Sequence, residues 1–371
     1  METYARDRTK QHPPFWCEVC SLDLQSAATL SQHIAGRKHA RRLWQQRATG
    51  DNQGDLRKTK LFPSRALPSI DEEELFDGLA KRKFRSVVVL TGAGVSTSAG
   101  VPDFRSPGSG IFEEIRSRFG ERFPEARDQP EVILSRSFAT AHPEVWETEV
   151  EPFVRSAVKS DNIFPTAAHK FCAWLHRQGF LRRVYTQNVD GLHLHPSLGL
   201  PKDMVVECHG SARNNTLVMY GDSLPMRFFD CCDIDFPENG TGSVDLIIVM
   251  GTSLQVAPFC AVPNMAPRGC TRVLVNRYLD ECLWNDFSPS RSQAAYGSVV
   301  VSGRTRIGSR KDVPLRPFWT DRKARKKWRQ LLIETDCDDF VASFFRSPAA
   351  TAKGLHLDDE GLTLKQEKFG L

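Results

Sequence analysis

Residues 87–100 read VVVLTGAGVSTSAG, and this stretch decides the fold. Its first four residues are apolar and mostly β-branched, which predicts a buried strand. The glycines and small residues that follow permit close approach of a phosphate group, which the start of a helix would attract. A tight turn without a ligand would have the same composition, so the turn alone is weak evidence for a phosphate site.

Short apolar runs alternate with helical patterns on the C-terminal side of this stretch. Strands are predicted at residues 87–90, 184–186, 205–206, 246–250 and 273–275, and helices at 143–158 and 166–178. A capping box at Ser69–Glu72 predicts an earlier helix. The alternation predicts an α/β fold with a doubly wound parallel sheet. Residues 278–327 show no such pattern and are expected to be irregular.

The composition excludes several classes of protein. The 371 residues are 40% hydrophobic and 26% charged, which argues against a wholly disordered, collagenous or coiled-coil chain. The longest apolar run, near Leu246–Met250, is far shorter than the ~20 residues of a membrane span. The first ten residues lack the apolar core of a secretory signal. We therefore expect neither secretion nor a membrane partner.

The positive charge is concentrated near the N-terminus. Residues 1–70 hold 12 Lys and Arg against 6 Asp and Glu, within a chain of net charge +5. This excess favours a polyanionic partner, although a solvated basic tail would have the same composition. The chain has 10 Cys but a single Cys-x-x-Cys pair, which indicates reduced thiols and one metal site.

Two cysteines and two histidines near the N-terminus have the spacing of a structural zinc site. Cys17, Cys20, His33 and His39 would complete a tetrahedral shell around zinc, which stabilises folds too small for a core. We assign residues 12–47 to a zinc finger. The polar, Gly- and Pro-containing residues 48–68 are expected to be a linker.

The finger sequence FWCEVCSLDLQSAATLSQHIAGRKHARRL resembles matrin-type zinc fingers. This resemblance implies binding of nucleic acid or protein. Basic residues around the second histidine suit phosphate groups, but they could equally form a solvated helix face. The sequence leaves RNA, DNA and protein open as partners. The basic residues are Arg37, Lys38, Arg41 and Arg42.

Several motifs together resemble the sirtuins, the NAD-dependent protein deacylases. They are GAGVSTSAGVPDFRSPGSGIF from Gly92, TQNVDGLH from Thr186, ECHGS from Glu207, YGDSLP from Tyr220, GTSLQVAP from Gly251, VNR from Val275 and, more loosely, TDCDD from Thr335. The resemblance covers about residues 70–346. It implies a Rossmann-like large domain, a small domain and NAD between them, so residues 69–347 are assigned to the catalytic domain and 348–371 to a flexible tail.

The resemblance also implies an activity, the NAD-dependent deacetylation of protein lysine. Its products would be nicotinamide, O-acetyl-ADP-ribose and free lysine, and its macromolecular partner an acetylated protein such as a histone. Two alternatives stay open. The chain could be a catalytically weak scaffold that binds NAD or ADP-ribose, or a protein ADP-ribosyltransferase that uses the same cleft.

The motifs assign roles to individual residues. His209 is the expected base, because an imidazole is near neutral at pH 7 and can accept a proton. Asn188 and Asp190 complete the expected catalytic set. The residues expected to bind NAD are Gly92, Ala93, Gly94, Thr97, Asp103, Phe104, Arg105, Gln187, Asn188, Asp190, Gly251, Thr252, Ser253, Asn276, Arg277 and Cys337.

The chain departs from the sirtuin pattern in its small domain. Sirtuins usually carry two Cys pairs after the HG motif, but here residues 211–220 continue almost directly into the next motif. We therefore expect no second zinc site and a reduced small domain. A reduced active variant, an inactive descendant and a mis-spliced gene would each explain this. The finger and the basic run 322–327 predict a nuclear location, while a cytoplasmic one stays open.

Overall fold

The chain divides into two compact units, Met1–Lys58 and Thr59–Leu371. The computed structural model describes residues 70–106, 108–158, 163–214, 216–237, 244–256, 258–278 and 329–355, and the backbone of 16–17, 22–23 and 300–302. The division between the units falls within the expected linker, residues 48–68.

In the first unit, strand β1 (Trp16–Cys17) pairs with β2 (Leu22–Asp23) in an antiparallel ladder. Cys17 therefore lies at the end of a two-residue strand, opposite Leu22 of β2. The other three expected zinc ligands, Cys20, His33 and His39, lie outside the described residues.

The second unit contains a parallel sheet of seven described strands. Their order is β5-β4-β3-β6-β7-β9-β8, and every neighbouring pair is parallel. Without β8, this is the strand order 3-2-1-4-5-6 of doubly wound dinucleotide-binding folds. The bounds are β3 Val87–Thr91, β4 Leu181–Thr186, β5 Val205–Glu207, β6 Leu246–Met250, β7 Thr271–Asn276, β8 Val300–Ser302 and β9 Arg329–Glu334.

The five strands predicted from apolar runs are confirmed as β3 to β7. The other two were not predicted. β9 contains a three-residue apolar run, Leu331–Ile333, as long as the run that predicted β7, and it was overlooked. β8 lies inside residues 278–327, so the expectation of irregular structure is wrong for Val300–Ser302, which pair with β9. The sequence holds a short β-branched run there, Val299–Val301, which was overlooked inside a segment without further pattern.

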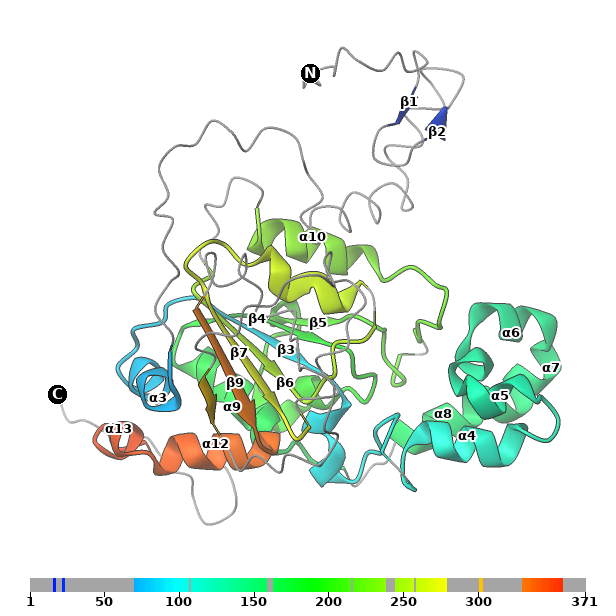
Figure 1. Ribbon diagram of the computed structural model, residues 1–371, viewed down its shortest axis with the longest axis horizontal. Helices are drawn as coiled ribbons and strands as arrows, with labels where there is room; N and C mark the ends of the chain where they lie inside the picture. Colours follow the sequence, from blue (N-terminus) through cyan, green and yellow to red (C-terminus); the bar gives the residue numbers. More distant parts are fainter. Residues whose placement is uncertain are drawn as a thin grey trace, which may run out of the picture. The chain divides into compact units, whose positions relative to one another are not determined.

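One face of the sheet is covered by four helices, which lie along the lower side of the strands in Figure 1. Phe76, Phe171, Trp174 and Phe344 pack there as an aromatic cluster, with Phe76 and Phe344 ring centres 5.5 Å apart. These helices are α3 Glu72–Ala80, α9 Ala167–Arg177, α12 Cys337–Arg346 and α13 Pro348–Thr351.

The ends of these helices correct two sequence predictions. The N-cap of α3 is Asp71, whose carboxylate accepts from the Glu74 amide at 2.8 Å, so the cap does not begin at Ser69. Residues 348–355, expected to begin a flexible tail, include α13, and Ala350 is buried in the core. The Ser347 hydroxyl caps that helix, which accounts for order beyond the expected boundary.

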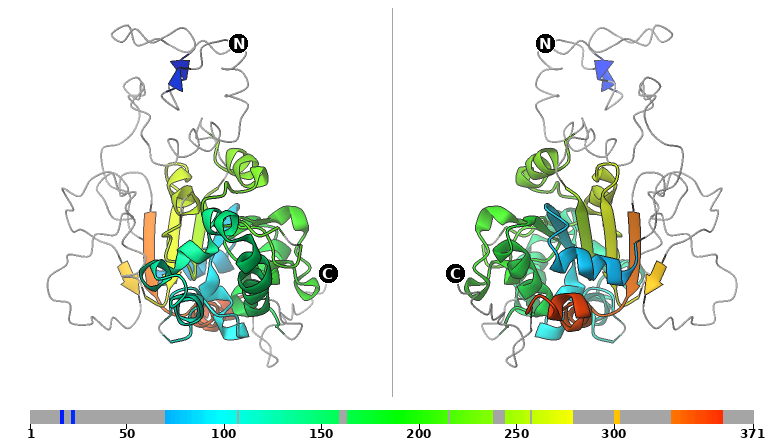
Figure 2. Two further views of the ribbon diagram at one scale, coloured as in Figure 1. Left: turned by 90° about the vertical axis from the view of Figure 1, so that its right-hand side faces the viewer. Right: turned by 90° about the vertical axis from the view of Figure 1, so that its left-hand side faces the viewer.

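The opposite face is covered by α10 (Met226–Asp235) and the 3₁₀ segment η9 (Phe259–Met265), and Figure 2 shows α10 and α12 on opposite sides of the strands. A buried carboxylate ties α10 to the sheet. Asp235 accepts hydrogen bonds from Arg182 at 2.8 Å, Arg183 at 2.5 Å and the Tyr185 hydroxyl at 2.7 Å. Three donors thus compensate for the burial of this charge.

Residues 110–158 form a separate group of helices, here called the helical lobe, at one side of the sheet (Figure 1). It has its own core, which includes Ile115, Phe119 and Phe138. The helix predicted at 143–158 is interrupted by a π-helical turn. The lobe comprises α4 Ile111–Phe119, α5 Glu125–Asp128, η4 Pro130–Leu134, α6 Arg136–Ala141, α7 Pro143–Val145, the π-turn η5 Trp146–Val150 and α8 Glu151–Val158.

The segment 218–222 ties the lobe to the sheet. Ser135 and Tyr220 form a parallel bridge, and Arg136 binds both carboxylate oxygens of Asp222 at 2.9 Å. On the other side of the segment, the Val218 amide donates to the His209 carbonyl at 2.9 Å. None of the described helices has the length and apolar character needed to span a bilayer.

Candidate functional site

The loops that follow the parallel strands gather at the carboxyl edge of the sheet. β3 and β6 are neighbours, and the chain proceeds from them toward opposite edges of the sheet. This is the topological switch point, where open α/β sheets bind ligands. The two loops that start there are residues 92–100 and 251–256, which contain most of the residues expected to contact phosphates.

The glycine-rich loop was expected to lead into the start of a helix, and it forms two 3₁₀ turns, η2 (Ala93–Val95) and η3 (Thr97–Ala99). Its glycines are required by the neighbouring loop. A Cβ on Gly92 would lie 2.5 Å from the Cβ of Thr252, and one on Gly94 would lie 2.7 Å from the Cα of Gly251. Packing between two protein loops therefore explains the glycines.

The same loop offers a donor for a phosphate. Ala93 and Gly94 are half-exposed, and the Ala93 amide has no acceptor among the described residues. An exposed amide at the first position of a helical turn suits an anion. The chemistry of this edge therefore fits the pyrophosphate of a dinucleotide.

A buried hydroxyl joins the glycine-rich loop to the loop after β4. Asn188 donates to the Ser96 hydroxyl oxygen at 3.0 Å, and Ser96 donates to the Asp190 carboxylate at 2.8 Å. The other oxygen of Asp190 accepts from the Leu192 amide at 2.9 Å. All three polar side chains are buried, so this chain of hydrogen bonds fixes the relative position of the two loops.

Gln187 contacts three elements of the site. Its amide donates to the Thr91 carbonyl at 2.9 Å, and its side-chain oxygen accepts from the Thr252 hydroxyl at 2.6 Å. Its carbonyl lies 3.0 Å from Nδ1 of His209. The ends of β3, β4, β5 and β6 are thereby joined at one residue.

His209 is held in the form that a base requires. Because the Gln187 carbonyl can only accept, Nδ1 of His209 carries the proton, and the unprotonated Nε2 has no partner among the described residues. Burial lowers the pKa of His209 below 6.5, although the hydrogen bond to Gln187 opposes this shift. At pH 7 the imidazole is therefore neutral, with its lone pair on Nε2.

The residues after the glycine-rich loop face the helical lobe. The Asp103 carboxylate holds its own turn by accepting from the amides of Arg105 at 3.0 Å and Ser106 at 2.7 Å. The ring of Phe104 packs 5.6 Å from that of Phe112, and the Arg105 guanidinium lies 5.5 Å from the centre of the Phe112 ring. These three expected NAD contacts thus lie against the lobe.

The remaining expected contacts lie around β6, β7 and α12. Asn276 donates to the Tyr278 carbonyl at 2.9 Å, and Arg277 pairs with Asp336 at 2.6 Å. Cys337 is buried at the first position of α12. Ser253 is half-buried, and the Thr97 hydroxyl donates to the Gly94 carbonyl at 3.2 Å, within its own loop.

Comparison with known proteins agrees with this geometry. The model of the Sir2 family matches residues 92–216. The NAD-dependent protein deacetylase sirtuin-2 of Danio rerio is 30% identical over 275 residues, which cover 62% of this chain and 67% of that protein. The NAD-dependent protein deacetylase hst2 of Schizosaccharomyces pombe is 31% identical over 242 residues, covering 55% and 67%. This chain belongs to the Sir2 family.

The N-terminal unit matches a different family. The model of the C2H2-type zinc finger matches residues 15–39, a span that includes all four expected zinc ligands. Two thiolates and two imidazoles are a donor set that zinc accepts without further ligands. The Sir2-family domain of this chain is thus preceded by a zinc finger.

Sequence reasoning missed three polar residues of the Sir2-family site. Ser96 and Thr91 were inside quoted motifs but were given no role, and Asp338 belongs to the loosely matching late motif. The Asp338 carboxylate accepts from the Ser98 hydroxyl at 2.5 Å and from the Ala168 amide at 2.9 Å. A local signal existed only for Ser96 and Thr91, which are small hydroxyl residues in an apolar stretch beside a glycine-rich turn.

Among the residues that the structure describes, no three His, Cys, Asp or Glu side chains cluster as a metal site would require. In this Sir2-family chain the segment after the HG motif runs instead to the Ser135–Tyr220 bridge. Burial raises the pKa of the Cys208 thiol well above its ordinary value, so this neighbour of His209 stays protonated.

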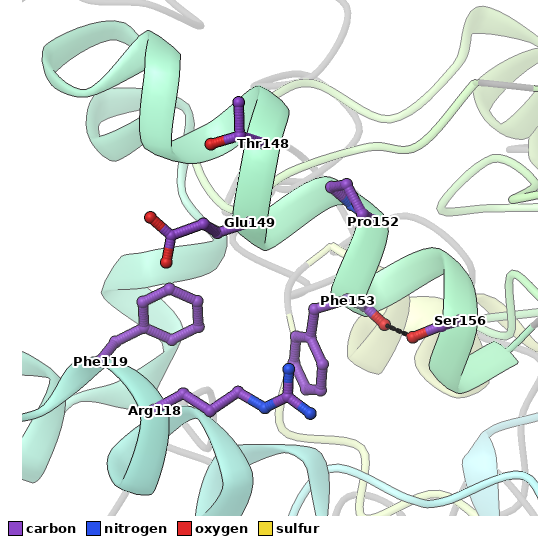
Figure 3. A pocket seen from close by; sticks show the side chains of 7 residues that line it. All are labelled: Arg118, Phe119, Thr148, Glu149, Pro152, Phe153 and Ser156. Carbon is purple, nitrogen blue, oxygen red and sulfur yellow. Dashed lines mark hydrogen bonds between the residues drawn. The ribbon is translucent and has the colours of Figure 1, made fainter.

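A cavity of about 610 Å³ lies within the helical lobe, apart from the site residues (Figure 3). Phe119 and Phe153 form its apolar wall, and the Arg118 guanidinium lies 4.8 Å from the Phe153 ring centre. None of the residues expected to bind NAD lines it. The candidate NAD site is therefore placed at the carboxyl edge of the sheet and not in this cavity.

Proposed function

We propose that this chain is an NAD-dependent protein-lysine deacetylase that yields nicotinamide, O-acetyl-ADP-ribose and free lysine. One observation supports it above the others, namely a neutral His209 whose Nδ1 is fixed by a carbonyl and whose Nε2 is available. His209 lies at the carboxyl edge of the sheet, near the topological switch point, where the loops fit a pyrophosphate. The names of the relatives support the same activity.

Within this proposal, the residues of the site have different roles. The Ala93 amide would hold phosphate, and the loop containing Asn188 and Asp190 would hold the nicotinamide ribose. Bound NAD would supply an electrophilic ribose carbon and a leaving group. His209 would take a proton from a ribose hydroxyl at Nε2, and the Gln187 carbonyl would stabilise the resulting imidazolium through Nδ1–H.

The acetylated substrate would bind as an extended strand. Residues 221–224 and 254–256 would flank the bound strand, and main-chain hydrogen bonds from such segments give affinity with little sequence readout. A histone tail is our candidate substrate. The exposed surface of the helical lobe includes Glu144 and Glu147, which would favour a basic peptide.

The test is turnover by the purified full-length chain, with an acetylated histone peptide in the presence and absence of NAD. Release of nicotinamide matched by deacetylated peptide would support the proposal. NAD binding without release would favour the scaffold alternative. Transfer of label from NAD to protein, without loss of acetyl groups, would favour the ADP-ribosyltransferase alternative.

We also propose that the zinc finger binds nucleic acid. The net positive charge of residues 1–70 supports contact with phosphates, which would make binding strongly salt-dependent. Titration of labelled RNA and DNA with the full chain and with Cys17→Ser tests this. Equal affinity of the two proteins would contradict the proposal, and the preferred nucleic acid would identify the ligand.

A nuclear location is the third part of the proposal. It rests on the finger and on the basic run 322–327, which lies outside the described residues. Imaging of the tagged chain, with and without alanine replacement of that run, tests it. A cytoplasmic signal from the unmodified chain would contradict the proposal.

A further inference from the structure

Residues 211–214, which follow the HG motif, are bonded to the loop after β4. The Ala212 amide donates to the Val189 carbonyl at 2.9 Å. The Ala212 carbonyl accepts from the guanidinium of Arg155, on α8 of the helical lobe, at 3.1 Å. Residues 211–214 are therefore joined both to the lobe and to the loop that contains Asn188 and Asp190.

A small apolar core supports this arrangement. Ala212 is 1% exposed and belongs to a cluster with Val101, Val158 and Leu192. Val101 follows the glycine-rich loop, Val158 ends α8 and Leu192 begins the 3₁₀ turn η6 (Leu192–Leu194). Because Ala212 is fixed in this core, the next residue, Arg213, begins from a defined position beside the loop after β4.

The side chain of Arg213 lies against the turn at Asp190 and Gly191. Its Nε donates to the Asp190 carbonyl at 3.1 Å. Gly191 has a φ of +71°, and a Cβ at this position would lie 2.7 Å from Cδ of Arg213. A side chain at residue 191 would therefore strain the left-handed backbone and also displace the arginine stem. The glycine thus permits both the turn and the contact with Arg213.

Asp190 is thereby held at both its side chain and its main chain. Its carboxylate accepts from the Ser96 hydroxyl at 2.8 Å and from the Leu192 amide at 2.9 Å. Its carbonyl accepts from Arg213. The bond from Ser96 fixes the carboxylate relative to the glycine-rich loop, and the bond from Arg213 fixes the peptide group relative to residues 211–214.

We propose that Arg213 is a positioning residue that holds the loop after β4 in the conformation that binds the nicotinamide ribose. It acts through the main chain of Asp190 and not through the dinucleotide. A hydrogen bond from a charged donor constrains the turn, and with it Asn188, before the ligand binds, which lowers the entropic cost of binding. This inference deepens the proposed deacetylase function and rests on it for the kinetic readout.

The substitution Arg213→Met keeps an unbranched stem against Gly191 and removes the Nε–H donor. Because Arg213 is an exposed residue, we expect a moderate effect, a rise of about fivefold in KM for NAD with a smaller change in kcat. Arg346→Met is the matched control, since Nε of Arg346 also donates to a backbone carbonyl, that of Ala342 at 3.2 Å, at the end of α12. It should leave both constants unchanged. An unchanged KM in Arg213→Met would overturn the proposal.

Two fragments of NAD separate loop positioning from direct contact with phosphate. ADP-ribose contains the second ribose, whereas ADP ends at the pyrophosphate. Calorimetry should show an affinity of Arg213→Met for ADP-ribose that is about fivefold weaker, and an affinity for ADP that is unchanged. An equal loss for both fragments would show that Arg213 binds phosphate through its charge, and would overturn the proposal.

Hydrogen exchange of the full chain without ligand provides a readout that does not require activity. The amides of residues 187–194 should exchange about fivefold faster in Arg213→Met than in the unmodified chain, while those of the buried strand β6 should keep their rate. Equal exchange at residues 187–194 in the two proteins would overturn the proposal. Faster exchange and weaker ADP-ribose binding, in a chain without deacetylase turnover, would refute the proposed function and retain the role of Arg213.

Discussion

The loops at the carboxyl edge of the sheet and the helical lobe are stabilised by different interactions. The loops are joined by buried, mostly neutral hydrogen bonds, with Ser96 0% exposed and Asp190 4% exposed. The lobe has several ion pairs at its surface, such as Arg122 with Glu149 at 2.6 Å. Removal of one member of a buried hydrogen-bond network costs much of its stabilising free energy, whereas an exposed ion pair contributes about 0–1 kcal/mol to stability.

The two kinds of interaction correspond to two structural roles. The loop network fixes His209 and its neighbours, while the lobe joins the sheet through the 218–222 segment and an exposed Arg136–Asp222 pair. Substitutions in the loops should have large effects that salt does not alter, and substitutions in the lobe small effects that depend on salt.

The largest effect is expected at His209. His209→Ala should lower kcat for deacetylation by at least about 100-fold, because general base catalysis contributes roughly 10²–10⁴-fold. NAD affinity, measured by calorimetry, should change little, since the imidazole orients a proton and does not hold the dinucleotide. His176→Ala is the control, and substantial turnover by His209→Ala would refute the assigned base.

Removal of the buried hydroxyl in the loop network should have the next largest effect. Ser96→Ala leaves the Asn188 amide and one Asp190 oxygen without their partner, which costs about 1–3 kcal/mol. Thermal denaturation should show this loss, together with weaker NAD binding. Ser137→Ala, in the lobe, should leave both unchanged. Equal stability of the two variants would contradict the contrast between the regions.

Acid should affect the loops before the lobe. Because burial lowers the pKa of His209 below 6.5, its neutral form persists in mild acid, and the acid limb of kcat/KM should lie below pH 6.5. The unfolded chain binds protons at His169 more readily, so the free energy of unfolding should fall between about pH 6.5 and pH 3. His169→Asn should remove that part of the pH dependence.

The lobe pair should have a smaller effect that responds to salt. Arg136→Gln breaks the bidentate contact with Asp222 at 2.9 Å and should lower stability by about 1 kcal/mol or less. The difference from the unmodified chain should shrink in 1 M salt. Arg116→Gln breaks a pair within the lobe and provides the control. A loss that salt does not reduce would show that the contact is effectively buried.

Metal removal should have the smallest effect on catalysis. A chelator should unfold the finger, which depends on zinc, and leave the deacetylation rate of the second unit unchanged. In the second unit, the Ser135–Tyr220 bridge and the Arg136–Asp222 pair join the lobe to the 218–222 segment without a metal ligand. If removal of zinc abolished turnover and added zinc restored it, the prediction that catalysis does not depend on zinc would be contradicted.

Much of the sheet could be predicted because its strands are continuous apolar runs. Leu246–Met250 is identical in prediction and structure, since a strand buried on both faces has a local signal. β8 has only the short run Val299–Val301 within an otherwise irregular segment, and its pairing with β9 identifies it as a strand. The break in the helix at Trp146–Val150 was equally invisible, because π-turns have no distinctive composition.

The site was predictable to the extent that motifs mark loop positions. The motifs placed Gln187 and His209 in one site, and the structure joins them at 3.0 Å. They could not show that Asp103 holds its own turn or that Ser96 links two loops, because these contacts depend on how distant segments approach. The Arg213–Asp190 contact has the same origin, since the two residues come from different loops.

Among the described strands of the sheet, the two outermost, β5 and β8, are three residues long. A short edge offers few free backbone groups to a strand of another molecule, which limits intermolecular pairing and fibril growth. The longer, apolar strands β3 and β6 lie in the interior of the sheet, where each is hydrogen-bonded to a neighbouring strand on both sides. The strand order that brings the dinucleotide loops together thereby also protects the molecule from aggregation.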